Sequence, residues 1–132
     1  MKYMLDTDTC IYLIRKKASG ILERIKTSMD MGLAISSITL AELEHGVAKS
    51  GNPQRNADAL IQMLSIIDVM PFDSIAASEY GQIRTDLEQK GAVIDNLDML
   101  IAAHAKSRNL ILVTGNTREF KRVKGLEVEN WV

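Results

Sequence analysis

The chain has 132 residues, of which 46% are hydrophobic and 25% are charged, and its formal net charge at pH 7 is -1. This composition excludes a largely disordered protein, and no apolar run reaches the roughly 18 residues that a membrane-spanning helix requires. A single cysteine excludes a disulfide framework and a zinc–thiolate site. We expect one globular domain over residues 1–132, and the N-terminal segment lacks a secretory signal, which favours a cytoplasmic protein.

Strand and helix patterns alternate along the chain. In chain order we expect a strand at 3–5, helices at 7–17 and around 21–25, a strand at 33–35, helices at 38–49 and 55–67, a strand at 69–70, a helix at 75–90 that Gly91 ends, a helix at 97–108, a strand at 110–113 and an edge strand at 127–131. In the helix at 55–67, the spacing places Leu60, Ile61 and Leu64 on one face. The alternation predicts an α/β fold, with a central, mainly parallel sheet flanked by helices on both faces.

Functional sites of such folds lie beyond the carboxyl ends of the strands, and this narrows the choice among the 17 acidic residues. Asp6 ends the first strand, Glu42 lies in the helix after the second, and Asp98 opens a later helix. Beyond the strongest strand, Asn116 and Glu119 add an amide and a carboxylate. Such carboxylates repel one another unless their pKa values rise or a cation binds, and oxygen ligands favour Mg²⁺ or Mn²⁺. A cation held in this way activates water and binds a phosphoryl oxygen, as phosphodiester hydrolysis requires.

Each of these acids also has a simpler structural explanation. Asp6 can serve only as the N-cap of the following helix, and Asp98 can stabilise its own helix through the helix dipole. Glu42 and Glu119 can be solvated surface residues. The indication of function therefore rests on their joint placement at strand ends.

Four segments carry more specific motifs: LDTDTCIYLI at 5–14, SSITLAELEHG at 36–46, NLDMLIAAHA at 96–105 and LVTGNTREFKRVKGLEVENW at 112–131. Together they resemble the PIN-domain ribonucleases, and more narrowly the VapC toxins of bacterial type II toxin–antitoxin systems. The resemblance implies a single PIN domain in which acidic residues hold one or two Mg²⁺ or Mn²⁺ ions for endoribonuclease activity. It assigns catalysis and metal binding to Asp6, Glu42 and Asp98, with Asn116 or Glu119 at the fourth catalytic position.

Three positions depart from the pattern of the family. Asp8 stands where the first motif usually has Asn, Asp95 where Gly is usual, and Gly115 where the last motif usually has Asn. The first two add negative charge beside the expected site, so we expect a greater demand for a cation or perturbed pKa values. The three core acids are retained.

A cluster of basic residues suggests how RNA is bound. Arg118, Lys121 and Arg122 follow the strongest strand, and we interpret them as phosphate contacts, with Lys106 and Arg108 extending the patch. Only 5% of residues are aromatic, so we expect no stacking platform for single strands and favour structured RNA. The resemblance implies tRNA, in particular the anticodon loop of initiator tRNA. It also implies a homodimer and a hetero-oligomer with a VapB-type antitoxin, which would neutralise a toxin that inhibits translation.

Two other functions remain open. The two histidines, His45 and His104, predict a metal-independent ribonuclease if they act as an acid–base pair. A receiver-like signalling domain also has this length, alternating elements and an acidic Mg²⁺ pocket. It would require an Asp at the end of the strand at 33–35 and a Lys after Thr114, and this chain has neither. We expect Cys10, within an apolar helix, to be buried and not a nucleophile.

Overall fold

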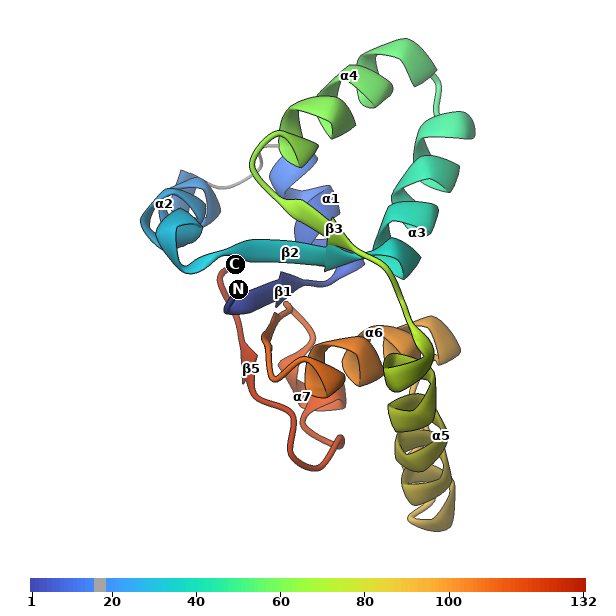
Figure 1. Cartoon of the computed structure of the whole chain (residues 1–132). Helices are drawn as coiled ribbons and strands as arrows, with labels where there is room; N and C mark the ends of the chain where they lie inside the picture. Colours follow the sequence, from blue (N-terminus) through green and yellow to red (C-terminus); the bar gives the residue numbers. More distant parts are fainter. Residues whose placement is uncertain (16–18) are drawn as a thin grey trace.

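The computed structural model describes residues 1–15 and 19–132 and shows alternating strands and helices (Figure 1). The elements are β1 (Tyr3–Leu5), α1 (Thr7–Arg15), α2 (Ser19–Ser28), the 3-10 helix η1 (Met29–Met31), β2 (Leu33–Ser36), α3 (Ser37–Ala48), α4 (Pro53–Leu64), β3 (Asp68–Met70), α5 (Ser74–Gln89), α6 (Asn96–Ser107), β4 (Ile111–Val113), α7 (Thr117–Phe120) and β5 (Val128–Glu129). The predicted α/β fold is confirmed. The expected end of the first helix, at Lys16 and Lys17, lies outside the described residues.

The five strands form one parallel sheet in the order β3-β2-β1-β4-β5. The central strand, β1, pairs Tyr3 with Leu33 on one side and with Ile111 on the other. Along the chain, β2 and β3 are therefore added on one side of β1, and β4 and β5 are then added on the other. Such a reversal of strand order is where open α/β sheets place their binding sites. Receiver domains have the order 2-1-3-4-5, so this topology does not support that alternative.

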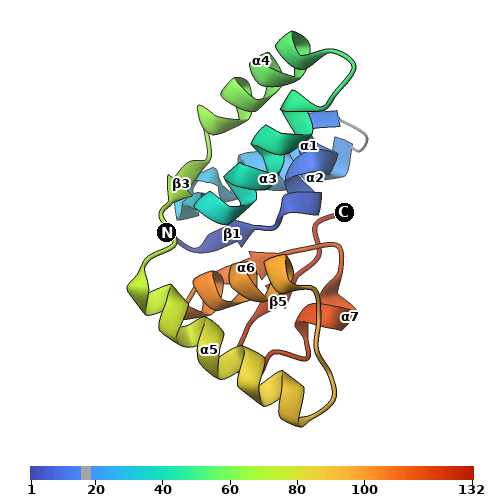
Figure 2. The ribbon, with the colours of Figure 1, turned by 90° about the vertical axis from the view of Figure 1, so that its right-hand side faces the viewer.

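The sheet separates two hydrophobic cores. Helices α1 to α4 lie on one face and α5 to α7 on the other (Figures 1 and 2). Tyr3 and Leu5 point into the first core, whereas Met4, between them, points into the second, as the alternation of side chains along a strand requires. All three side chains are buried. The predicted helices on both faces are confirmed.

Three details of the helices differ from the sequence-based expectation. Helix α4 begins at Pro53, because the side chain of Asn52 accepts the backbone N–H of Arg55 at 3.2 Å and proline fits a first helical turn. The grouping of Ile61 with Leu60 on one face is wrong, since Ile61 is 66% exposed while Leu60 and Met63 are buried. Helix α7 was not predicted, because four residues are too few to show a helical period.

The hairpin of α5 and α6 carries acidic residues to the carboxyl edge of the sheet. Helix α5 ends at Gln89, just before the predicted stop at Gly91, whose φ of +64° lets the backbone N–H of Ala92 reach the carbonyl of Leu87 at 2.9 Å. The chain then runs back to the start of α6. No helix within the described ranges is long and apolar enough to cross a membrane.

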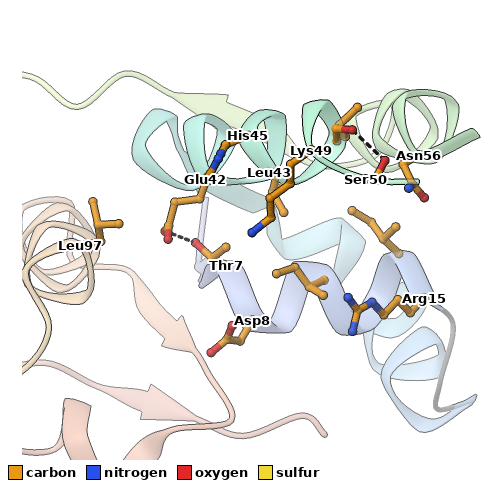
Figure 3. A pocket seen from close by; sticks show the side chains of 14 residues that line it. Thr7, Asp8, Arg15, Glu42, Leu43, His45, Lys49, Ser50, Asn56 and Leu97 are labelled. Atoms are coloured by element: carbon orange, nitrogen blue, oxygen red, sulfur yellow. Dashed lines mark hydrogen bonds between the residues drawn. The ribbon is translucent and has the colours of Figure 1, made fainter. Parts of the chain in front are cut away.

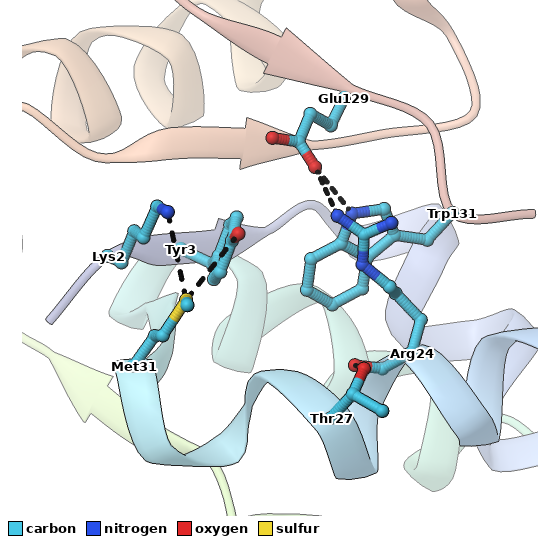
Figure 4. A network of polar contacts seen from close by, with 7 residues as sticks. All are labelled: Lys2, Tyr3, Arg24, Thr27, Met31, Glu129 and Trp131. Atoms are coloured by element: carbon cyan, nitrogen blue, oxygen red, sulfur yellow. Dashed lines mark hydrogen bonds and ion pairs between the residues drawn. The ribbon is translucent and has the colours of Figure 1, made fainter.

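Strand β5 has only two residues, so its pairing with β4 at the edge of the sheet is short, and side-chain contacts add to it. Glu129 Oε1 accepts hydrogen bonds from Arg24 at 2.9 Å and from the indole N–H of Trp131 at 3.0 Å (Figure 4). The guanidinium of Arg24 lies 5.0 Å from the Trp131 ring centre, and that ring packs edge-on against Tyr3 at 4.9 Å. This network ties the chain end to α2 and β1.

Candidate active site

Asp6 lies at the carboxyl end of the central strand. Its Oδ1 accepts the backbone N–H of Thr9 at 2.9 Å. Asp6 is therefore the N-cap of α1, which is the structural role that the sequence predicted for it. The side chain is 3% exposed, and burial raises its pKa, while hydrogen bonds from Thr114 and Thr9 oppose the shift. The cap uses one carboxylate oxygen, so Asp6 combines the structural role with a position at the switch point of the sheet.

Asp98 lies in the first turn of α6 and is half-buried. Burial is the main cause that raises its pKa to about 7. Nearby carboxylates raise it further, namely those of Asp95, Asp6, Glu119 and Asp8. The structure therefore brings together acids from three separate segments, as expected for carboxylates at one sheet edge.

The two acids that depart from the family pattern both contribute to this negative field. Asp95 is the N-cap of α6, and its Oδ2 accepts the backbone N–H groups of Leu97 at 3.0 Å and Asp98 at 3.4 Å. Asp8 is exposed in the first turn of α1. Both charges raise the pKa of Asp98, in agreement with the expectation of perturbed pKa values.

Glu42 reaches the site from α3, on the other side of β1. Figure 3 shows its carboxylate directed at Thr7, whose hydroxyl donates a hydrogen bond to Glu42 Oε1 at 2.6 Å. Thr7 is buried at the start of α1 and also bonds the hydroxyl of Thr39 at 3.2 Å. Thr7 was not predicted as a site residue, although Thr7 follows Asp6 directly in the sequence. Its contact with a residue 35 positions away cannot be inferred from spacing.

Asn116 and Glu119 flank Asp6 from the opposite side, beyond β4. Asn116 precedes α7, and its backbone N–H donates to the hydroxyl of Thr114 at 2.9 Å, while its side chain makes no capping bond. Glu119 is half-buried, and its charge reaches Asp98. Both residues therefore lie at the edge that holds Asp6 and Asp98.

The set of donors fits a hard divalent cation. Within residues 1–15 and 19–132, no three His, Cys, Asp or Glu side chains form a ready metal-binding group. The converging side chains nevertheless offer oxygen donors alone, and the mutual repulsion at Asp98 is of the kind that a cation relieves. Asp6 and Asp98, whose charges interact, and Glu42, which bonds the residue that follows Asp6, remain the predicted ligands.

Comparison with known proteins identifies the family. The model of the PIN domain matches residues 3–126. A protein of Shigella flexneri, the tRNA(fMet)-specific endonuclease VapC, is 45% identical over 131 residues, which cover 99% of this chain and 98% of the relative. The chain belongs to the VapC group of the PIN-domain family.

Solved structures of PIN-domain relatives agree closely with this fold. The VapBC2 complex of Rickettsia felis bound to a DNA fragment from their promoter has a matching chain that is 42% identical, with a TM-score of 0.96 and full coverage of both chains. The DNA-bound VapBC of Salmonella typhimurium matches with 43% identity and a TM-score of 0.96, covering 100% of this chain and 99% of that one. The PIN-like fold expected from the sequence motifs is confirmed.

A groove of about 450 Å³ runs along this PIN domain between α1 and α3 and opens beside the acidic residues (Figure 3). At the acidic end it is lined by Thr7, Glu42 and Leu97. Farther along, its lining is largely apolar, with a charged rim, and includes Ile11, Ile14, Val47, Arg15 and Lys49. An elongated partner lying in this groove would reach Glu42.

The basic residues of the predicted RNA-binding patch divide into two groups. Arg118, Lys121 and Arg122 are exposed on and after α7, near the acidic edge. The extension of this patch to Lys106 and Arg108 is wrong, because these residues pair with Glu79 at 2.9 Å and Asp73 at 3.7 Å. Helix α6 is about 18 Å long and carries them away from the carboxyl edge.

The histidines do not form a pair. His104 is fully buried, with its Nδ1 2.8 Å from Ser36 Oγ and its ring edge-on to Phe72. Burial lowers its pKa, so the ring is neutral at pH 7. His45 is exposed on α3. Cys10 is buried as predicted, and burial raises the pKa of its thiol, which disfavours a thiolate nucleophile.

Proposed function

We propose that this chain, as a single PIN domain over residues 1–132, is a metal-dependent endoribonuclease that hydrolyses phosphodiester bonds in tRNA. The observation that carries the proposal is the convergence of acids from three segments on Asp98, whose pKa rises to about 7. Initiator tRNA is the substrate we favour, because a relative of 45% identity is a tRNA(fMet)-specific endonuclease.

In this proposal Asp6, Glu42 and Asp98 hold Mg²⁺ or Mn²⁺ with their carboxylate oxygens. The bound ion supplies a Lewis acid for a phosphoryl oxygen and lowers the pKa of water. Because β1 lies between β2 and β4, Glu42 approaches from one side of Asp6, and Asn116 and Glu119 from the other. These side chains orient the scissile phosphodiester and the attacking water between them.

The exposed basic residues Arg118, Lys121 and Arg122 would contact the phosphates that flank the cleaved bond. Arg118 and Lys121 lie within two residues of Glu119, so these cations stand beside the acidic edge. The backbone of structured RNA thus meets positive charge next to a site that would otherwise repel it.

The decisive experiment compares cleavage of initiator and elongator tRNA by the purified protein in Mg²⁺, in Mn²⁺ and in EDTA. Asp6→Asn is the loss-of-function variant, because Asn can still cap α1. Asp58→Asn, which makes the same change at an exposed position on α4, is its control. We expect discrete fragments of initiator tRNA that disappear in EDTA and in Asp6→Asn. Cleavage that persists in EDTA would contradict the metal-dependent mechanism and favour the histidines.

We also propose that the chain is the toxin of a toxin–antitoxin pair that acts on translation in the cytoplasm. Its partner would be a VapB-type antitoxin, with which it forms a hetero-oligomer around a toxin homodimer. The matched solved structures are VapBC complexes, and the groove between α1 and α3 offers an apolar surface that ends at Glu42. Val47→Asp should weaken the complex without abolishing tRNA cleavage, as measured by co-purification and by the cleavage assay. Retention of the partner by this variant would exclude the groove.

A further inference from the structure

Thr7 connects the two elements that carry Asp6 and Glu42. It is the first residue of α1, directly after Asp6, and its side chain is buried. Its Oγ1 lies 2.6 Å from Glu42 Oε1 and 3.2 Å from Thr39 Oγ1 (Figure 3). Thr39 is 0% exposed, so this contact is shielded from water on the α3 side.

The chemistry of the three groups fixes the direction of these hydrogen bonds. A hydroxyl carries one proton, and an ionised carboxylate only accepts. Thr7 therefore donates to Glu42 and accepts from Thr39. Thr39 and Glu42 are three residues apart on α3 and face α1 together, so Thr7 is held at the meeting point of both helices.

We propose that Thr7 is a positioning residue that fixes the direction of the Glu42 carboxylate, an inference that rests on the proposed ribonuclease function. Glu42 is only half-buried, and a glutamate on a helix surface otherwise samples several rotamers. In the described part of the chain, Thr7 is the one side chain that hydrogen-bonds this carboxylate. Bonding through Oε1 leaves Oε2 for the site.

This arrangement makes one short segment responsible for two of the three core carboxylates. The junction between β1 and α1 places Asp6 through the backbone and Glu42 through the hydroxyl of the next residue. The position of Glu42 relative to Asp6 is therefore set by a local contact, although 36 positions separate the two residues along the chain. Removal of the hydroxyl should leave the Glu42 carboxylate without the hydrogen bond that fixes its direction.

The test uses the full-length protein with Thr7→Val, Thr7→Ser and the control Thr85→Val, which removes an exposed hydroxyl bonded to the Gly81 carbonyl at 2.8 Å. The first readout is Mn²⁺ affinity, measured by electron paramagnetic resonance, and the second is the single-turnover rate of tRNA cleavage. Loss of a hydrogen bond to a ligating carboxylate typically costs 10–100-fold in metal affinity or activity, so we expect a loss of roughly this size in Thr7→Val. Thr7→Ser should restore most of it, and Thr85→Val should match the wild type.

A double-variant cycle with Glu42→Ala separates positioning from a general structural role. If Thr7 acts through Glu42, adding Thr7→Val to Glu42→Ala should not weaken Mn²⁺ binding further. Additive losses would overturn the inference, as would wild-type Mn²⁺ affinity in Thr7→Val or failure of Thr7→Ser to restore it. If the wild type cleaves no tRNA, the proposed function fails, and the series of Mn²⁺ affinities still decides the role of Thr7.

Discussion

Asp95 and Asp98 lie one turn apart at the start of α6, where the carboxylate of Asp95 accepts the backbone N–H of Asp98 at 3.4 Å. The residue that caps the helix thus also places a negative charge beside Asp98. Burial and this charge, with those of three further acids, raise the pKa of Asp98 from 3.8 to about 7. Without a cation, the folded protein holds a proton there that the unfolded chain releases near pH 4.

Asp98→Asn should stabilise the protein above neutral pH when metal is removed. The raised pKa means that the contribution of Asp98 to the free energy of unfolding falls as pH rises from about 4 to 7 and stays low above that range. Because the side chain is partly exposed, we expect a rise in Tm of roughly 2–5 °C at pH 8 and almost none at pH 4. Thermal unfolding in EDTA at both pH values measures this, with Asp58→Asn as the control. An equal change at both pH values would contradict the assigned cause.

Mn²⁺ binding to the wild type should strengthen with pH. A carboxyl must lose its proton to act as a ligand, so a pKa of about 7 at Asp98 makes binding compete with protonation. We expect the Kd for Mn²⁺ to be about tenfold weaker at pH 6 than at pH 8. Calorimetry in buffers of different ionisation enthalpy should show proton release at pH 6. Binding that is independent of pH would exclude Asp98 as a ligand.

Asp95→Asn isolates the acid that stands in place of glycine. Asn retains an oxygen for the helix cap, so α6 should remain intact, while the loss of charge lowers the pKa of Asp98. The ratio of Mn²⁺ Kd values between pH 6 and pH 8 should then fall from about tenfold to about fourfold. Asp95→Gly should in addition lower Tm, because the cap is lost. An unchanged ratio in Asp95→Asn would show that Asp95 does not tune the site.

His45→Ala tests the metal-independent alternative. His45 is exposed on α3, and His104 is buried against Ser36 and Phe72, so the two rings do not face a common substrate. We expect tRNA cleavage by His45→Ala to stay within about twofold of the wild type, since general acid–base catalysis contributes 10²–10⁴-fold where it operates. A loss of that size, together with cleavage in EDTA, would favour the histidine mechanism.

The parts of the fold that were predicted from the sequence are those in which one local pattern decides the outcome. The runs Tyr3–Leu5 and Ile111–Val113 are apolar on both faces, as buried parallel strands require, and Gly91 ends α5 through a backbone conformation that favours glycine. Ile61 was misplaced because the choice between two adjacent apolar residues depends on the rotation of α4 against its neighbours. A helical period alone does not define that rotation.

The candidate site residues that could be predicted from the sequence are those whose position depends on where a strand or helix begins or ends. Asp6 follows directly from the rule that parallel strands present their carboxyl ends at one edge, whereas Asp98 was found as an acid that opens a helix. The assignment of Lys106 to the same edge failed because closeness in sequence to Val113 says nothing about which end of α6 a residue occupies. The contact between Thr7 and Glu42 depends on how α1 packs on α3, which is a tertiary property.

The sheet lies between the two hydrophobic cores, α3 and α6 touch across its edge, and the acidic site draws on residues of both layers. Glu42 belongs to the layer of α1 to α4, Asp98 to the layer of α5 to α7, and Asp6 to the strand that both layers share. A small slide of one layer over the sheet would change the spacing between Glu42 and Asp98, and the packing of Ile38 of α3 against the second core opposes such a slide. The distance that a bound ion has to bridge is thus governed by the mutual alignment of the two layers, and a partner that grips one layer acts on the site as a whole.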